Sequence, residues 1–164
     1  MFKTKLLILL LVSSIFFSCS SNQIVSFDKK YSLGYIPGEY DGLTFANLLR
    51  NNLKNIQAFD KNSELVITGE IKHTENLFIT NINNTSDREK ITSSIKINIE
   101  DKGGKCLSFS YNNQVSQFYI FSSSDKFLSN VLAQKKIKNQ NTEILVDKFI
   151  NEVIYKEKFC KEIK

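Results

Sequence analysis

The chain has 164 residues, of which 41% are hydrophobic and 24% are charged. These values are ordinary for a globular protein, and they exclude a wholly disordered chain, a polytopic membrane protein and a collagen-like fibre. Lys and Arg number 22 against 17 Asp and Glu, so the net charge is +5. A basic excess could meet phosphate on nucleic acid or on anionic lipid, but a genome rich in A and T would also raise Lys, Asn and Ile together. The charge alone therefore identifies no partner.

The first 18 residues have the pattern of a cleaved export signal. Lys3 and Lys5 supply positive charge, and Leu6–Phe17 is apolar apart from two serines. These twelve residues would span only about 18 Å as a helix, too short for the roughly 30 Å hydrocarbon core of a bilayer. We therefore predict a signal peptide over 1–18, whose removal lowers the net charge from +5 to +3.

The segment Phe16–Cys19 resembles a bacterial lipobox, in which the cysteine is lipidated and becomes the first residue of the mature protein. We predict a covalent lipid, palmitate among its acyl chains, on Cys19 and a polar tether over 19–30. Two or three acyl chains anchor a protein stably, because each buried methylene contributes about 0.8 kcal/mol. Ser20, rather than Asp, follows the cysteine, and by resemblance to bacterial sorting rules this favours the outer membrane. The alternative is an ordinary signal followed by an incidental cysteine.

Cys106 and Cys160 are the other cysteines, and His73 is the only histidine. An exported protein can form disulfides, but Cys106 lies on the polar side of its predicted strand, which disfavours a bridge to the final helix without deciding the question. Two thiols and one histidine make no recognisable zinc site, so no metal is expected. His73 alternates with Ile71 on a predicted strand and is expected to face solvent.

Hydrophobic periodicity predicts a single domain over residues 31–164. Alternation over 31–35 predicts a first strand, which the turn Pro37-Gly38 ends. A helix is then expected to begin at Asp41 or Gly42. Its apolar residues recur at helical spacing: Leu43, Ala46, Leu49, Leu53 and Ile56.

Three further strands are predicted. Residues 65–71 form the second, which could extend to residue 79 through a bulge or bend at 75–76, before a polar loop over 81–87. In the third strand Ile91, Ile95, Ile97 and Ile99 point one way, and Thr92, Ser94, Lys96, Asn98 and Glu100 point the other. The paired glycines of Asp101–Lys105 take positive φ at little cost and predict a hairpin to a fourth strand. One apolar and one polar face is typical of an antiparallel sheet.

Ser122–Asp125 offers N-capping oxygens to a long final helix. Its predicted buried stripe holds Leu128, Val131, Leu132, Leu145, Phe149, Val153 and Ile154. The stretch Gln134–Asn141 is more polar, so we expect the helix to bend or project there. The complete pattern predicts a two-layer α+β domain, with two helices packed on one face of a mostly antiparallel four-stranded sheet.

Catalytic constellations are largely absent from the sequence. The six glycines form neither a phosphate loop nor a dinucleotide fingerprint, and no serine stands in a nucleophile elbow. Local ion pairing explains the trio Asp87, Arg88 and Glu89 better than acid–base chemistry does. The polar face of the third strand lacks the aromatic residues that sheet-based RNA readers use. We predict no enzyme, no nucleic-acid partner and no cofactor beyond the lipid on Cys19.

The order of these features carries a family resemblance. After the lipobox and first strand comes a helix containing Leu48–Leu53, and a strand and loop lead to Asp87-Arg88. The isoleucine strand, the Gly-Gly hairpin, a strand ending in Val115–Tyr119 and a helix with Leu132–Lys135 in its first turns complete the chain. Together they resemble the lipopolysaccharide-assembly lipoprotein family, LptE.

The resemblance implies an outer-membrane lipoprotein on the periplasmic side or in the lumen of a large β-barrel. Members plug the barrel, help it to assemble and help to pass lipopolysaccharide to the outer leaflet. The expected partners are thus the barrel, lipopolysaccharide and the lipid around the anchor. The resemblance also implies that basic side chains bind lipopolysaccharide, and the matching positions are Arg88 with Lys90 and Lys135 with Lys136. The alternative is that these are simply solvated charges.

Two other roles fit the same sequence. One is an auxiliary lipoprotein of an ABC-type lipid transporter, whose partners would be a permease and an ATPase. The other is a solitary envelope lipoprotein, an adhesin or ligand-binding module, which would have no stable stoichiometric partner.

Overall fold

The computed structural model of the protein describes residues 29–78, 87–104, 108–121 and 127–156. The signal over 1–18, Cys19, Cys106 and Cys160 lie outside these residues, as do most of the tether, most of the polar loop and the capping segment before the last helix.

Four strands form one sheet in the order β1-β2-β3-β4. Their bounds are β1 (Ser32–Leu33), β2 (Leu65–Phe78), β3 (Asp87–Asp101) and β4 (Phe109–Phe121). β1 is parallel to β2, and the other pairs are antiparallel. β2 runs its full length without a bulge, because Glu75 and Asn76 pair in unbroken register with Ile91 and Lys90.

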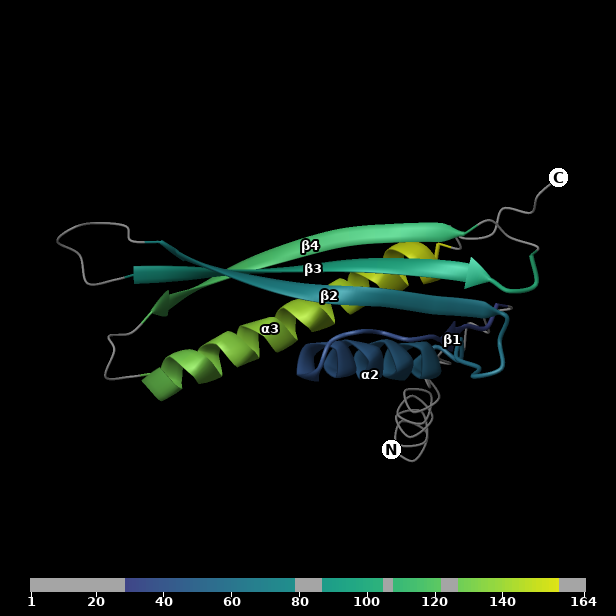
Figure 1. The fold of residues 1–164 in the computed structure, drawn as a ribbon, viewed down its shortest axis with the longest axis horizontal. Helices are drawn as coiled ribbons and strands as arrows, with labels where there is room; N and C mark the ends of the chain where they lie inside the picture. The colour runs from purple at the N-terminus through teal and green to yellow at the C-terminus, as the bar shows by residue number, and fades with distance from the viewer. Residues whose placement is uncertain (1–28, 79–86, 105–107, 122–126, 157–164) are drawn as a thin grey trace, which may run out of the picture.

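Both long helices cover the same face of this sheet (Figure 1). They are α2 (Tyr40–Asn55) and α3 (Phe127–Phe149), and a π-helical turn, η2 (Ile150–Ile154), continues α3. The predicted two-layer α+β fold is therefore confirmed. The entry to α2 requires glycine twice: Gly38, before the helix, has a φ of 106°, and a Cβ on Gly42, in the first turn of the helix, would lie 2.2 Å from the carbonyl oxygen of Pro37.

The hydrophobic core lies between the covered face of the sheet and the two helices. Ile95, Ile97 and Ile99 of β3 are at most 2% exposed, as the alternation of the sequence predicts. Phe45, Leu49 and Leu53 of α2 and Leu145, Val146 and Phe149 of α3 pack against them. Full burial of such a side chain stabilises the fold by about 1.5–3 kcal/mol, so this cluster fixes the helices on the sheet.

The predicted buried stripe of α3 is wrong in its first half. Leu128, Val131 and Leu132 are 70%, 38% and 57% exposed. The residues of the same half that are buried are Asn130, Ile137, Asn141 and Thr142. Spacings of three and four residues place the buried polar groups on the same face as Leu145, so the helix turns its leucines outward.

The polar stretch Gln134–Asn141 neither bends nor projects, contrary to expectation. α3 is an uninterrupted α-helix from Phe127 to Phe149, and Asn141 is fully buried within it. The stretch packs against the sheet because the strands beneath it carry polar side chains of their own, Glu89 and Ser93 among them.

Candidate functional site

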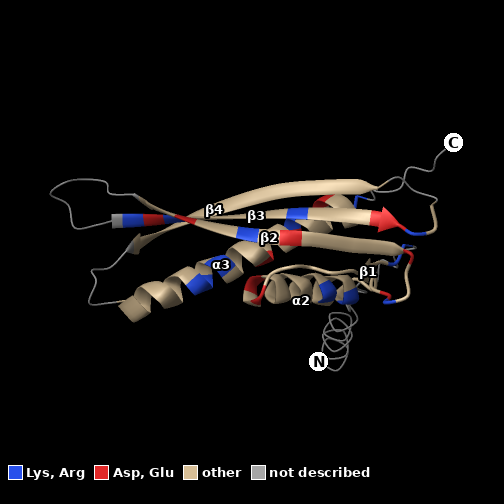
Figure 2. Cartoon of the chain, viewed as in Figure 1, with Lys and Arg blue, Asp and Glu red and all other residues tan. Residues whose placement is uncertain are grey.

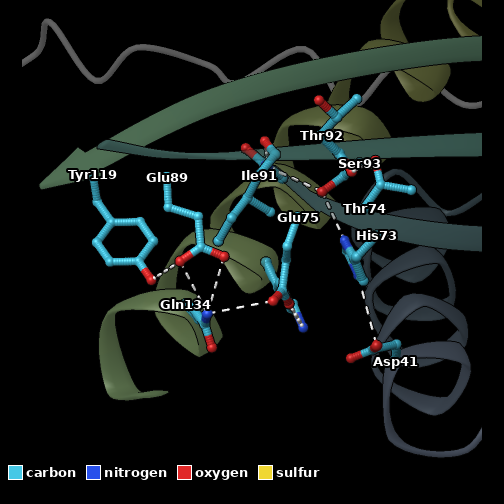
Figure 3. A network of polar contacts seen from close by, with 12 residues as sticks. Asp41, His73, Thr74, Glu75, Glu89, Ile91, Thr92, Ser93, Tyr119 and Gln134 are labelled. Atoms are coloured by element: carbon cyan, nitrogen blue, oxygen red, sulfur yellow. Dashed lines mark hydrogen bonds and ion pairs between the residues drawn. The ribbon is translucent and has the colours of Figure 1, made fainter. Parts of the chain in front are cut away.

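The sheet has two different ends. The tip is formed by the end of β2, the start of β3, the end of β4 and the start of α3, and the base is the opposite end, where β1 joins β2. The apolar core lies toward the base. On the covered face toward the tip, side chains of α2, β2, β3, β4 and α3 form a network of polar contacts instead (Figure 3).

His73 is a central member of this polar network. Its Nδ1 lies 2.7 Å from the Ser93 hydroxyl, and its Nε2 lies 3.9 Å from a carboxylate oxygen of Asp41. Asn141 of α3 donates to the same Ser93 hydroxyl over 3.0 Å. One histidine therefore ties β2 to β3 and α2, and Ser93 extends the connection to α3.

The prediction that His73 faces solvent is wrong, since its side chain is only 4% exposed. The physical reason is the period of a strand. His73 lies two residues from Ile71, and both pair with inward-pointing positions of β3, namely Ser93 and Ile95. Burial lowers the pKa of the His73 imidazole, an effect that the carboxylate of Asp41 opposes.

Asp41, His73 and Ser93 have the connectivity of a hydrolytic triad, in which a carboxylate orients an imidazole that contacts a hydroxyl. The Ser93 residue is 0% exposed, however, and lies beneath Asn141 of α3. A substrate carbonyl has no route to a hydroxyl in that position. The arrangement holds elements together rather than presenting a nucleophile.

Glu89 is the second centre of the network and is only 6% exposed. Its carboxylate accepts hydrogen bonds from the Tyr119 hydroxyl and, over 3.2 Å, from the Gln134 amide. Burial and the hydrogen bond to Glu89 raise the pKa of the Tyr119 phenol. The same Gln134 amide lies 3.3 Å from Glu75, which also forms a 2.6 Å ion pair with Lys138. Side chains of β2, β3 and β4 thus meet α3 here.

The sequence contains a signal for this network in the alternation of β3. Glu89 and Ser93 occupy the same alternating positions as Ile91 and Ile95, so strand periodicity places two polar residues on the buried face. Polar residues at buried positions need partners. The partners come from the polar stretch of α3, whose Gln134 and Asn141 lie seven residues apart, or about two helical turns.

The predicted lipopolysaccharide-binding residues lie on two different layers. Arg88 and Lys90 of β3 alternate with the inward-pointing Glu89, so they project from the uncovered face; the Lys90 ammonium lies 5.8 Å from the centroid of the Phe118 ring. Lys135 and Lys136 are exposed on α3, on the opposite side of the sheet (Figure 2). The structure does not bring the two pairs into one pocket.

Lys135 occupies a hollow between the helices. Its ammonium lies 4.8 Å from the centroid of the Tyr40 ring. The hollow has a volume of about 280 Å³, and its lining includes Asp41, Val131 and Lys138. A cation beside apolar surface in an open hollow could hold the anionic head of an amphiphile.

The tip also exposes large apolar side chains on both layers. More than half of the surface of each of these six is accessible: Leu77, Phe118, Ile120, Phe127, Leu128 and Leu132. Single exposed apolar residues are common, but their concentration at one end makes the tip a candidate interaction surface. Arg88, Lys90, Lys135 and Lys136 flank this end of the molecule.

Two further features bear on chemistry. Among the described residues, no three His, Cys, Asp or Glu side chains gather in a way that could hold a metal ion. No helix in the described ranges combines the length and the apolar character needed to cross a membrane.

No protein-family model matches the chain, and a search of curated proteins finds no relative. Solved structures do match its fold. Rare lipoprotein B from Shewanella oneidensis is 11% identical, with a TM-score of 0.61 over 79% of this chain and 96% of that one. A minor lipoprotein from Acinetobacter baumannii is 14% identical, with a TM-score of 0.57 over 85% and 99% of the two chains. An uncharacterised lipoprotein B from Nitrosomonas europaea is 9% identical, with a TM-score of 0.62 over 84% and 90%. The chain therefore has the fold of these bacterial lipoproteins.

Proposed function

We propose that the protein is an outer-membrane lipoprotein, anchored through Cys19, that plugs and helps to assemble the lipopolysaccharide-export β-barrel and assists delivery of lipopolysaccharide to the outer leaflet. The observation that carries this proposal is the fold shared with rare lipoprotein B over 96% of that chain. It agrees with the lipobox at Phe16–Cys19 and with the resemblance of the sequence to the LptE family.

The surface of the domain suits this role. The uncovered face of the sheet is polar, with Ser94, Lys96, Asn112 and Gln114 around an open hollow of about 410 Å³. Such a face is compatible with the hydrated interior of a large barrel. The helices occupy the other face, so the domain is a compact two-layer body rather than an open sheet.

The tip suits an anionic amphiphile. Its exposed apolar side chains could contact acyl chains, while the basic residues on both layers could pair with lipid A phosphates. Hydrogen bonds from Lys and Arg to phosphate are charge-assisted and are stronger than neutral ones. Because the two basic pairs lie on opposite layers, they would contact different molecules of a lipopolysaccharide aggregate and help to separate them.

The partner is tested by purifying tagged full-length protein from detergent-solubilised envelopes and identifying co-purifying proteins by mass spectrometry. The expected result is a large β-barrel protein in near-equimolar amount that survives washing. Recovery of a permease with an ATPase would assign the protein to a lipid transporter instead. Recovery of no stoichiometric partner would favour a solitary envelope lipoprotein.

The lipid site is tested by charge reversal at the tip. We expect Arg88→Glu combined with Lys135→Glu to weaken lipopolysaccharide binding at least about tenfold, because each lost phosphate contact contributes on the order of 1 kcal/mol. Lys61→Glu combined with Lys102→Glu makes the same change in net charge on exposed residues at the base and should leave binding intact. Equal binding by a folded tip variant and the base variant would remove Arg88 and Lys135 from the site.

A further inference from the structure

The hollow between α2 and α3 contains an ammonium group that belongs to no ion pair of the described residues. The hollow has a volume of about 280 Å³, and its lining includes Tyr40 of α2 and Lys135 and Lys138 of α3. The Lys135 ammonium lies 4.8 Å from the centroid of the Tyr40 ring, and no described carboxylate pairs with it. Lys138 differs, because Glu75 pairs with it over 2.6 Å. Lys135 is therefore the cation that the hollow offers to a ligand.

The same hollow contains a carboxylate whose charge is not compensated. Asp41 lines the hollow, and its side chain is 45% exposed. The one cationic side chain beside it is His73, whose Nε2 lies 3.9 Å away (Figure 3). Burial lowers the pKa of His73 below the ordinary 6.5, so this imidazole is mostly neutral at about pH 7 and does not neutralise Asp41. The hollow thus presents one positive and one negative charge, and no ion pair joins Lys135 to Asp41.

This combination of charges favours a zwitterion. A purely anionic group would pair with Lys135 but would also meet the negative charge of Asp41, and like charges brought together weaken binding. A purely cationic group would have the reverse difficulty, whereas a ligand with both charges complements both side chains. The volume lies just below the roughly 300–1,000 Å³ of pockets that enclose whole small molecules, so it suits a head group.

An apolar surface adjoins the hollow on α3. Val131 lines the hollow and is 38% exposed, and Leu128, three residues before it, is 70% exposed. Residues three and four apart lie on the same side of a helix, so Leu128, Val131 and Lys135 follow one line toward the start of α3 at the tip. Acyl chains attached to a head group in the hollow could lie along this line. The ligand that fits the hollow and its surroundings is therefore a lipid.

We infer that the hollow binds the phosphoethanolamine group of a lipid, with the phosphate at Lys135 and the ammonium at Asp41. The phosphate would draw Lys135 away from the Tyr40 ring, because a charge-assisted hydrogen bond is stronger than an exposed cation–π contact. The vacated ring could then contact the ammonium of the ligand. A primary ammonium also donates hydrogen bonds to a carboxylate, whereas the trimethylammonium group of choline has no N–H to donate. The inference rests on the proposed function, in which Lys135 contacts a lipid phosphate, and adds that Asp41 selects which phosphates are bound.

Equilibrium binding to the full chain, purified in a non-ionic detergent and followed by native mass spectrometry, tests this selection. Two sets of ligands are compared. One is phosphatidylethanolamine against phosphatidylcholine and phosphatidylglycerol with the same acyl chains, and the other is lipopolysaccharide with and without phosphoethanolamine on its phosphates. We expect the phosphoethanolamine member of at least one set to bind at least about fivefold more tightly. A preference within the phospholipids alone would make the ligand a phospholipid, and a preference within the lipopolysaccharides alone would make it lipopolysaccharide.

Variants of the hollow assign the preference to its charges. Asp41→Asn should abolish the preference, and Tyr40→Leu, at an exposed position, should lower it and preserves the test if Asp41→Asn does not fold. Glu39→Gln is the matched control, because it makes the same change in net charge at the same end of α2, on an exposed side chain outside the hollow, and it should retain the preference. Lys135→Gln should instead weaken binding of every member of both sets.

The outcomes separate this inference from the proposed function. Equal binding of all members by the wild-type protein, weakened throughout by Lys135→Gln, would overturn the selection by Asp41 and leave the lipid contact of Lys135 in place. A preference that survives in both Asp41→Asn and Tyr40→Leu would also overturn the inference, as would its equal loss in Glu39→Gln. Binding of no lipid by the wild-type protein would overturn both the inference and the proposed delivery of lipopolysaccharide.

Discussion

Asn141 is 0% exposed, and its side-chain amide is satisfied on one side only. The Nδ2 group donates to Ser93 and to the backbone carbonyl of Ile91, while Oδ1 has no hydrogen-bond partner among the described residues. An unsatisfied buried acceptor costs about 1–3 kcal/mol. Asn141 therefore helps to fix how α3 sits on β3, but the burial of its amide lowers the stability of the protein.

His73 should make the stability of the protein depend on pH. Burial lowers the pKa of its imidazole below the ordinary 6.5, so the unfolded chain binds this proton more readily than the folded protein does. The free energy of unfolding should then fall as the pH decreases below about 6.5. Asp41 and Glu75 oppose the shift and Lys138 reinforces it, so the net effect follows the direction set by burial.

Urea unfolding at about pH 7 and about pH 5.5 measures this effect. His73→Gln keeps a group that can hydrogen-bond to Ser93 but does not titrate. We expect the wild-type protein to lose more stability than this variant over the interval. An equal loss in both proteins would show that His73 does not carry the pH dependence.

Removal of the Tyr119 hydroxyl should weaken the network around Glu89. The phenol donates to a buried carboxylate, and hydrogen bonds to charged groups contribute about 1.5–3 kcal/mol. Because Gln134 still donates to Glu89, we expect Tyr119→Phe to lower the free energy of unfolding by about 1–2 kcal/mol. Tyr35→Phe, at a side chain that is 81% exposed, is the control and should change little. Equal effects of the two substitutions in chemical denaturation would refute a structural role for the contact.

At the scale of elements, α3 consists of two halves that meet the sheet differently. Its second half buries Leu145, Val146 and Phe149 in the core, whereas its first half buries Asn130 and directs leucines to solvent. Tertiary packing holds both halves on the sheet, but most of the apolar burial belongs to the second half, since Ile137 is the one apolar side chain among the buried residues of the first half. The first half depends on polar contacts with β2, β3 and β4.

This division predicts stability losses of different size for substitutions of leucine along one helix. Leu128→Ser combined with Leu132→Ser should change the free energy of unfolding by less than about 1 kcal/mol, because both side chains are mostly exposed. Leu145→Ala, in the core, should cost about 2–5 kcal/mol. The thermal midpoints of the two variants measure the difference. A larger loss from the double variant than from Leu145→Ala would place the leucines in a packed environment.

The elements also show how far the sequence determines the structure. The isoleucine part of β3 could be predicted, because its isoleucines alternate with polar residues and a strand has a period of two. The core half of α3 followed from its apolar spacing. Its first half did not, because Leu128 and Leu132 also have helical spacing and only tertiary contacts decide which stripe faces inward. His73 was misplaced although the same period of two that placed Ile95 puts it on the covered face.

The candidate site was predictable only in part. Sequence resemblance selects Arg88, Lys90, Lys135 and Lys136, but a linear sequence cannot show that these pairs lie on opposite layers. The separation of the two basic pairs depends on which side chains of β3 point to the covered face and on where α3 crosses the sheet. The polar network was not predicted, because its contacts join positions between 20 and 63 residues apart in the chain, from His73 and Ser93 to Glu75 and Lys138.

At the scale of the whole molecule, the base and the tip differ in what holds them together. The base contains the continuous apolar core, and the tip contains buried polar contacts beneath exposed apolar side chains. Polar contacts that water can reach open more readily than a packed core does. The difference should appear as a gradient of local stability along the same strands.

Hydrogen exchange followed by mass spectrometry tests that gradient. We expect backbone amides over 66–71 and 95–99 to exchange more slowly than those over 74–77 and 88–91, although all four segments are paired within β2 and β3. Because each strand supplies one segment near the base and one near the tip, differences between β2 and β3 do not affect the comparison. Uniform protection along β2 and β3 would mean that the polar network is as stable as the core.

The unbroken pairing of β3 also makes the domain a rigid spacer. β3 pairs with both neighbours along nearly its entire length, and its 15 residues extend roughly 45 Å at about 3.3 Å per residue. The described chain enters at the base, where Tyr31 hydrogen-bonds to Ala58. The span from Tyr31 at the base to the tip is therefore set by the number of paired strand residues, and adding or removing such residues would change it.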